Sequence, residues 1–195
     1  MRVVVNEFIS LDGVVQAPGG PEEDTDGGFA HGGWSMPYFD VEVMGEVIGE
    51  GMSTVDALLF GRRTWQAMAA AWPDRAGDPY ADQMNAIKKY VVSRTLTHDD
   101  LSWNNTTLLS SDAVGEIAAL RARDGGDLMI WGSASLVTTL LAEGLIDELT
   151  LMIEPILLGG GKRIFPADAM ARPLQLVKSV TATTGVLVCT YRPTS

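Results

Sequence analysis

The chain has 195 residues, of which 46% are hydrophobic and 20% are charged, as in an ordinary globular domain. Its net charge of −11 argues against a nucleic-acid partner, because phosphate contacts need clustered lysine and arginine. With one cysteine, Cys189, and two histidines, we expect no disulfide and no metal site built from these residues. No apolar stretch approaches about 20 residues and no signal peptide is evident, so we expect a cytoplasmic protein without membrane contact.

β-branched residues predict a first strand over residues 3–9, although Asn6 and Glu7 interrupt its apolar character. The composition then changes over residues 17–33, which hold six glycines, two prolines and four acidic residues. Such a segment can bury little, so we expect a long mobile loop. We weigh two roles equally for this loop, a functional lid and a dispensable insertion.

The next segment carries the pattern of an amphipathic helix. This helix is predicted to begin at Ser35 or Pro37 and to run to about Met52. Apolar side chains recur along it at helical spacing and are expected to form its buried stripe: Val41, Met44, Val47 and Ile48.

The rest of the chain alternates short apolar strands with helices. Strands are predicted over residues 57–60, 90–92, 106–109, 128–131 and 146–155, and a closing hairpin over 174–182 and 186–191. Helices are predicted over residues 64–71, 79–87 and 112–123, with a further helix that ends at 142. This order predicts one three-layer α/β domain over residues 1–195: a mixed, mostly parallel central sheet, helices on both faces and an antiparallel C-terminal hairpin.

Three of the buried strands end in turns that are small or basic. These turns are Gly61-Arg62-Arg63-Thr64, Ser93-Arg94-Thr95 and Gly132-Ser133-Ala134-Ser135. Ligands of open α/β sheets bind beyond the carboxyl ends of the strands, where free helix N–H groups and arginine side chains attract anions. One such turn is weak evidence, because an arginine there is usually just solvated. Three together predict several phosphates, and a dinucleotide with an extra ribose phosphate meets that requirement.

Other sequence motifs for nucleotide binding or hydrolysis are missing. The Gly161-Lys162 pair lacks the spacing and the hydroxyl of a P-loop, and no G-x-G-x-x-G follows the first strand. No serine lies in a nucleophile elbow, and neither histidine belongs to a triad motif. We expect His98 in an exposed loop. For His31 solvent exposure is favoured over a role at the substrate.

The three strand-end turns, extended to Trp65, Val92 and Leu136, resemble those of the dihydrofolate reductase-like superfamily. Two further segments, Ser10-Leu11-Asp12-Gly13 and Pro155-Ile156-Leu157-Leu158-Gly159-Gly160-Gly161, look like the reductase domain of the bifunctional riboflavin-biosynthesis deaminase–reductase and its stand-alone relatives. The resemblance covers nearly the whole chain. It is specific for fold and cofactor but not for substrate. The deaminase zinc signature is absent from this sequence, because it needs more than one cysteine.

The resemblance implies an NADPH-dependent reductase that transfers hydride to a small unsaturated heterocycle, pteridine- or pyrimidine-like, or to a carbonyl. The residues that it implies for the cofactor are Leu11, Gly13, Gly61, Arg62, Arg63, Thr64, Ser93, Arg94, Gly132, Ser133, Ala134, Ser135 and Leu136. The residues that it implies for the substrate side are Gly160, Gly161 and Lys162, with Arg163 as an alternative to Lys162. A protein that keeps the fold without turnover, as an NADP(H)-binding or interaction module, is the alternative.

The proton for such a reduction has three candidate sources: Asp12, Asp40 and bound water. Asp40 lies near the place where dihydrofolate reductases carry a helix carboxylate, but its register differs. The simpler interpretation, an acidic residue that favours a helix N-terminus, carries more weight. A homodimer is expected because relatives often form one, with Trp103 and Tyr191 as exposed apolar candidates for the interface.

Overall fold

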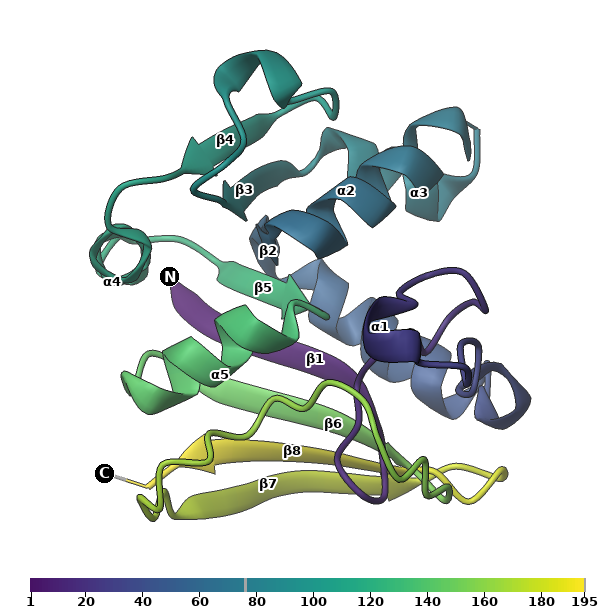
Figure 1. Cartoon of the computed structure of the whole chain (residues 1–195). Helices are drawn as coiled ribbons and strands as arrows, with labels where there is room; N and C mark the ends of the chain where they lie inside the picture. The colour runs from purple at the N-terminus through teal and green to yellow at the C-terminus, as the bar shows by residue number, and fades with distance from the viewer. Residues whose placement is uncertain (76, 195) are drawn as a thin grey trace.

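The structure is a computed structural model that describes residues 1–75 and 77–194. Its strands form one sheet in the order β4-β3-β2-β5-β1-β6-β8-β7 (Figure 1). The strands are β1 (Arg2–Ser10), β2 (Val55–Gly61), β3 (Lys88–Val92), β4 (Thr106–Leu109), β5 (Asp127–Trp131), β6 (Glu148–Glu154), β7 (Leu174–Thr181) and β8 (Leu187–Pro193). From β4 to β6 neighbouring strands are parallel, and β8 is antiparallel to both β6 and β7. The predicted mixed sheet with an antiparallel C-terminal hairpin is confirmed.

Helices cover both faces of the sheet, as predicted. They are α1 (Val43–Ser53), α2 (Arg62–Ala71), α3 (Pro79–Ala86), α4 (Ala113–Arg121) and α5 (Ala134–Ala142), with short 3-10 turns at Asp26–Gly28, Met36–Tyr38, Pro73–Arg75 and His98–Asp100. The alternation of side chains along a strand separates two buried clusters. One contains Val5 of β1 and Val137 of α5, and the other contains Val4 of β1 with Met44 of α1 and Trp65 of α2.

The helix predicted to begin at Ser35 or Pro37 begins only at Val43. The chain first makes the 3-10 turn Met36–Tyr38, and the Asp40 carboxylate then accepts hydrogen bonds from the Glu42 and Val43 N–H groups. Such bonds mark the start of a helix, because the first N–H groups have no partner within it. Val41 therefore precedes the helix and is 74% exposed, contrary to its predicted place in the buried stripe.

The prediction that Trp103 is exposed is wrong. Its side chain is 1% exposed, and its indole N–H donates to Asn85 Oδ1 at 2.7 Å. The ammonium group of buried Lys89 lies 4.4 Å from the ring centroid. Trp103 thus belongs to the core beside β3 and cannot contribute to a dimer surface, whereas Tyr191 is half-buried.

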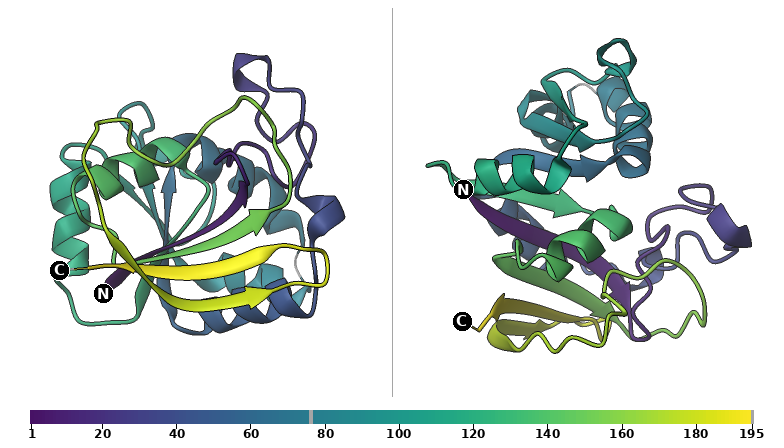
Figure 2. Two further views of the ribbon diagram at one scale, coloured as in Figure 1. Left: turned by 90° about the horizontal axis from the view of Figure 1, so that it is seen from below. Right: turned by 60° about the vertical axis from the view of Figure 1, so that its left-hand side comes forward.

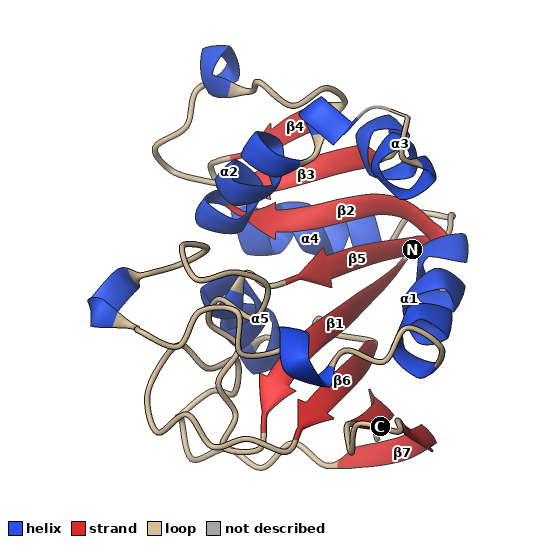
Figure 3. Ribbon diagram, turned by 90° about the vertical axis from the view of Figure 1, so that its right-hand side faces the viewer, coloured by secondary structure: helices blue, strands red, loops and turns tan. Residues whose placement is uncertain are grey.

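The parallel strands all end on one side of the molecule, where the long loops gather (Figure 3). The loop of residues 17–33 lies on this side, opposite the two chain termini (Figure 2). Among residues 1–75 and 77–194, no helix is long and apolar enough to cross a membrane. Within the same residues, no group of His, Cys, Asp or Glu side chains could hold a metal ion. Ligands of open α/β sheets bind at the carboxyl ends of the parallel strands, and the candidate site lies there.

Candidate functional site

Helices α2 and α5 follow the neighbouring strands β2 and β5, and the turns before them are joined by hydrogen bonds. The Gly61 N–H donates to Ser133 Oγ at 2.9 Å, and the Ser133 N–H donates to Thr64 Oγ1 at 3.0 Å. Gly132 has a φ of +60°, and a Cβ atom there would lie 3.2 Å from Thr64 Cγ2. A glycine is therefore needed for these two turns to approach so closely.

These two helices differ from α3 and α4 in how they begin. Asp78 caps α3 by accepting from the Tyr80 and Ala81 N–H groups, and Asp112 caps α4 by accepting from Gly115. No side chain of the described residues caps α2 or α5. Two adjacent helix N-termini thus have N–H groups and positive dipole ends available to an anion.

The predicted basic residues lie along the same edge of the sheet. Arg62 is half-buried and Arg63 is exposed in the first turn of α2, and Arg94 is exposed beyond β3. The Ser93 hydroxyl accepts from the Thr95 and Leu96 N–H groups, so it stabilises the turn that carries Arg94. Because β3, β2 and β5 are consecutive in the sheet, the three predicted turns form one continuous edge.

Acidic side chains of the 17–33 loop contact cations of this edge. Asp26 forms an ion pair with Arg63. Asp26 also pairs with the Lys162 ammonium group at 2.9 Å, and Asp24 pairs with the same group. The loop therefore bridges the start of α2 and the glycine loop after β6, and its carboxylates occupy cations that an anionic ligand would use.

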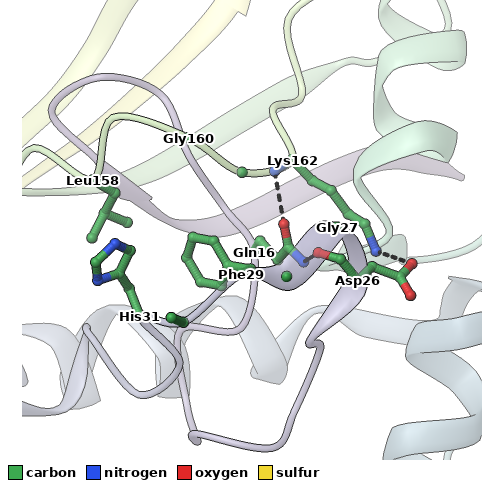
Figure 4. A pocket seen from close by; sticks show the side chains of 11 residues that line it. Gln16, Asp26, Gly27, Phe29, His31, Leu158, Gly160 and Lys162 are labelled. Atoms are coloured by element: carbon green, nitrogen blue, oxygen red, sulfur yellow. Dashed lines mark hydrogen bonds and ion pairs between the residues drawn. The ribbon is translucent and has the colours of Figure 1, made fainter.

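A cavity of about 500 Å³ lies between this loop and the glycine loop after β6 (Figure 4). Residues from both loops line it, among them Gln16, Phe29, His31, Leu158, Gly160, Gly161 and Lys162. The Gln16 side chain connects the two loops, because it donates to the Asp26 carbonyl at 3.0 Å and accepts from the Lys162 N–H at 3.1 Å. The three residues predicted for the substrate side are thus together in one cavity. His31 is exposed, and its ring meets Phe29 edge-on at 5.5 Å.

Asp12 anchors the glycine loop. Its carboxylate accepts from the Leu158 N–H at 3.0 Å, from the Ser10 hydroxyl at 2.7 Å and from the Gly159 N–H at 2.8 Å. These bonds, led by the one from Leu158, lower the pKa of Asp12 to about 2. Asp12 is therefore ionised at neutral pH, and its geometry does not support the predicted role of proton donor.

Asp40 has an equally structural place. Its carboxylate accepts from the Thr183 hydroxyl at 2.7 Å and from the Thr183 N–H at 2.9 Å, in addition to the N–H groups that begin α1. These bonds, led by the Thr183 hydroxyl, lower its pKa to about 2. These contacts agree with the favoured interpretation of Asp40 as an acidic residue at a helix N-terminus, and a catalytic Asp40 stays an untested prediction. Asp40 holds the start of α1 against the turn between β7 and β8.

Two buried glutamates were missed as site candidates, and both have one oxygen without a hydrogen-bond partner. Glu7 on β1 is 2% exposed, and burial raises its pKa well above the ordinary value. Glu154 at the end of β6 is fully buried. It accepts from the Ser35 hydroxyl at 2.5 Å, and burial raises its pKa to about 7. An acidic residue inside an apolar strand could have identified Glu7, because burying a charge is costly. From the sequence, Glu7 was identified only as an interruption of the apolar pattern.

The comparisons with known proteins agree with this architecture. A family model described as the RibD C-terminal domain matches residues 1–188. The chain belongs to the RibD C-terminal domain family. The resemblance inferred from the strand-end turns is therefore confirmed, and with it the α/β fold of this RibD-type domain.

Individual relatives are similar to this chain over nearly its whole length. The uncharacterized protein YyaP of Bacillus subtilis (strain 168) is 27% identical, with 97% of this chain and 94% of YyaP covered. A structure from Shewanella sp. PV-4, named for riboflavin biosynthesis, superposes with a TM-score of 0.71 at 24% identity over 100% of both chains. Dihydrofolate reductase from Enterococcus faecalis, complexed with NADP(H) and RAB-propyl, superposes with a TM-score of 0.62 at 16% identity, covering 100% of this chain and 97% of that one. These likenesses show a reductase-type fold.

Proposed function

We propose that this RibD-type domain is an NADPH-dependent reductase. The observation that carries the proposal is the pair of uncapped helices, α2 and α5, which begin side by side at the ends of adjacent strands. Two positive helix ends at that spacing suit a ligand with separated phosphates. The Enterococcus faecalis relative, whose structure contains NADP(H), shares the fold and so supports this choice of ligand.

The residues present fit such a dinucleotide. In this proposal the turn from Gly132 to Leu136 holds the pyrophosphate, and Arg62 or Arg63 binds the 2′-phosphate through its guanidinium group. Ser93 and Arg94 lie at the adenosine end. Exposed Leu11 and neighbouring Gly13 border the nicotinamide. The acidic loop must release Arg63 before a phosphate can bind there, since Asp26 occupies that side chain.

The substrate in this proposal lies in the cavity beside Gly160, Gly161 and Lys162, and is a small unsaturated heterocycle or a carbonyl compound. Bound NADPH would supply the hydride, while the chain orients the reactants and excludes water. Asp12 and Asp40 are ionised and committed to backbone groups, which leaves water as the proton source among the three considered. Closure of the 17–33 loop would cover the cavity.

Fluorescence titration with NADPH and NADH tests the proposal. We expect NADPH to bind more tightly, and Arg63→Ala to reduce that preference about tenfold, in line with loss of a charge-assisted contact. Absence of binding by both nucleotides at high micromolar concentration would overturn it. Turnover is then measured as NADPH oxidation with pterins, pyrimidines and quinones.

The engagement of both aspartates in structural hydrogen bonds favours one alternative, a protein that binds NADP(H) without turnover. That protein would bind NADPH in the titration yet oxidise none of the compounds in the panel. The homodimer and the cytoplasmic location stay predictions. Light scattering on a size-exclusion column tests the homodimer.

A further inference from the structure

Glu7 lies where β1 and β5 reach the turn that begins α5. The neighbouring residue Asn6 is paired with Trp131, the last residue of β5, so Glu7 is level with Gly132. On the other side Glu7 is paired with Leu151 of β6. Its side chain points to the face of the sheet that α5 covers, because Val5 and Ile9 on either side belong to that buried cluster. The carboxyl group is therefore next to the turn proposed to hold the pyrophosphate.

The surroundings of Glu7 favour its neutral form. Burial is the main cause of its raised pKa, and the charge of Glu23 in the 17–33 loop raises it further. The nearby Gly132 N–H acts in the opposite direction and lowers the pKa. Helix α5 carries no charged side chain between Ala134 and Ala142, and the β6 neighbour is Leu151. No cation of these elements compensates an ionised Glu7.

A neutral carboxyl group has an O–H donor as well as an accepting oxygen. In Glu7 the oxygen Oε1 is buried and has no partner among the described residues. With the proton on Oε1, the O–H group therefore has no acceptor among the described residues. A buried donor without an acceptor is costly, so an oxygen atom placed there by a ligand would complete the site.

We propose that Glu7 is a cofactor-binding residue whose neutral carboxyl group donates a hydrogen bond to an oxygen of the dinucleotide. The inference rests on the proposed function, since it assumes that the ligand occupies the Gly132 turn. The proton stays on Glu7 throughout, and no covalent step is involved. Ionised Glu7 would lack the donor and would repel the phosphates at short range in a medium of low dielectric constant.

The first test compares substitutions at a fixed pH. NADP⁺, which tolerates acid, is titrated at pH 6 and monitored by tryptophan fluorescence, with circular dichroism to verify folding. Glu7→Gln keeps an accepting oxygen and an N–H donor, so we expect wild-type affinity. Glu7→Leu keeps the approximate size but no donor, and we expect a loss of about tenfold, the usual effect of one hydrogen bond to a charged group. Equal affinity of the folded Glu7→Leu variant and the wild type would overturn the proposal.

The second test follows the same titration to pH 9. Above the pH at which Glu7 ionises in the free protein, wild-type affinity should fall by up to about tenfold per pH unit, because one proton is taken up on binding. In Glu7→Gln, the affinity should change with pH only as far as the ionisation of the ligand's own 2′-phosphate requires. Glu154→Gln removes the other buried glutamate, on the opposite face of the sheet, and should keep the wild-type pH dependence.

Carbon-13 NMR of labelled glutamate, assigned with Glu7→Gln, reads the ionisation of Glu7 directly. NADP⁺ should shift its titration to higher pH, and a shift to lower pH would contradict the proposal. Repeating the titrations with 2′-phospho-ADP-ribose, which has the pyrophosphate but no nicotinamide, identifies the accepting oxygen. If Glu7→Leu also weakens the binding of this ligand, the accepting oxygen belongs to the pyrophosphate. If Glu7→Leu binds it as tightly as wild type, the accepting oxygen belongs to the carboxamide. Failure of wild type to bind any of these ligands would refute the proposed function instead.

Discussion

The Ser133 hydroxyl accepts a hydrogen bond from the Gly61 N–H at 2.9 Å, so residues 72 positions apart join the starts of α2 and α5. Ser133 adopts a left-handed backbone with a φ of +60°, and its N–H donates to Thr64 Oγ1. The two N-termini are thus held at a fixed spacing before any ligand arrives. Such preorganisation would reduce the free-energy cost of binding the proposed dinucleotide.

Ser133→Ala should weaken both folding and cofactor binding. The Gly61 N–H would lose its acceptor, so we expect the free energy of unfolding to fall by about 1 kcal/mol. We also expect NADPH to bind a few-fold more weakly, because the spacing of α2 and α5 is no longer fixed. Urea denaturation and fluorescence titration measure the two effects, with the exposed Ser110→Ala as control. Unchanged NADPH affinity in a destabilised Ser133→Ala protein would contradict the proposed role of the turn.

Asp26→Asn should strengthen NADPH binding. The substitution removes a carboxylate that pairs with both Arg63 and Lys162, so the phosphates of the ligand meet less competition. We expect a gain of about two- to fivefold at low salt, since an exposed ion pair is worth at most about 1 kcal/mol. Glu22→Gln removes an exposed negative charge of the same loop and serves as the control for net charge. Equal gains in both variants would show that Asp26 does not compete for the site.

Loss of the Asp40 hydrogen bonds should destabilise the protein and change its response to acid. The pKa of Asp40 is about 2 in the folded chain and near the ordinary 3.8 when unfolded. The unfolded state therefore binds more protons between these values, and stability falls as the pH drops from about 4 to 2. Asp40→Asn should lower the melting temperature at pH 7 and flatten this acid dependence. Thermal melts between pH 2 and 7 provide the measurement; a wild-type acid profile in Asp40→Asn would contradict it.

Glu154→Gln should stabilise the protein above neutral pH. Its pKa of about 7 in the folded chain lies above the ordinary 4.5, so the folded state binds more protons between these values. The free energy of unfolding therefore falls as the pH rises from about 4.5 to 7. A neutral glutamine does not ionise, so at pH 8 it avoids a loss of roughly 2–3 kcal/mol in the free energy of unfolding. Denaturation at pH 5 and pH 8 checks this, with exposed Glu143→Gln as control. A greater gain at pH 5 than at pH 8 would refute it.

Much of this protein was determined by local sequence. Apolar runs such as Leu58–Phe60 and Leu128–Trp131 indicated buried strands, and the glycine and arginine turns after them indicated an anion site. These patterns work because a strand buried on both faces must be apolar, and because a turn that approaches an anion needs glycine and free N–H groups. The fold, the family and the alignment of the three turns along one edge were accessible in this way.

The tertiary structure decided the roles of the acidic residues. Asp12 and Asp40 were two of three candidate proton sources, and Leu158 and Thr183, distant in sequence, donate to their carboxylates and keep them ionised. In the sequence, Glu7 was only a polar residue within an apolar strand. The pairing of β1 with β5 shows that it lies beside Gly132. A carboxyl group's proton affinity depends on burial and on donors supplied by other elements. Local sequence therefore predicts the position of the candidate site, and the packing of strands and loops decides the charge of its acidic residues.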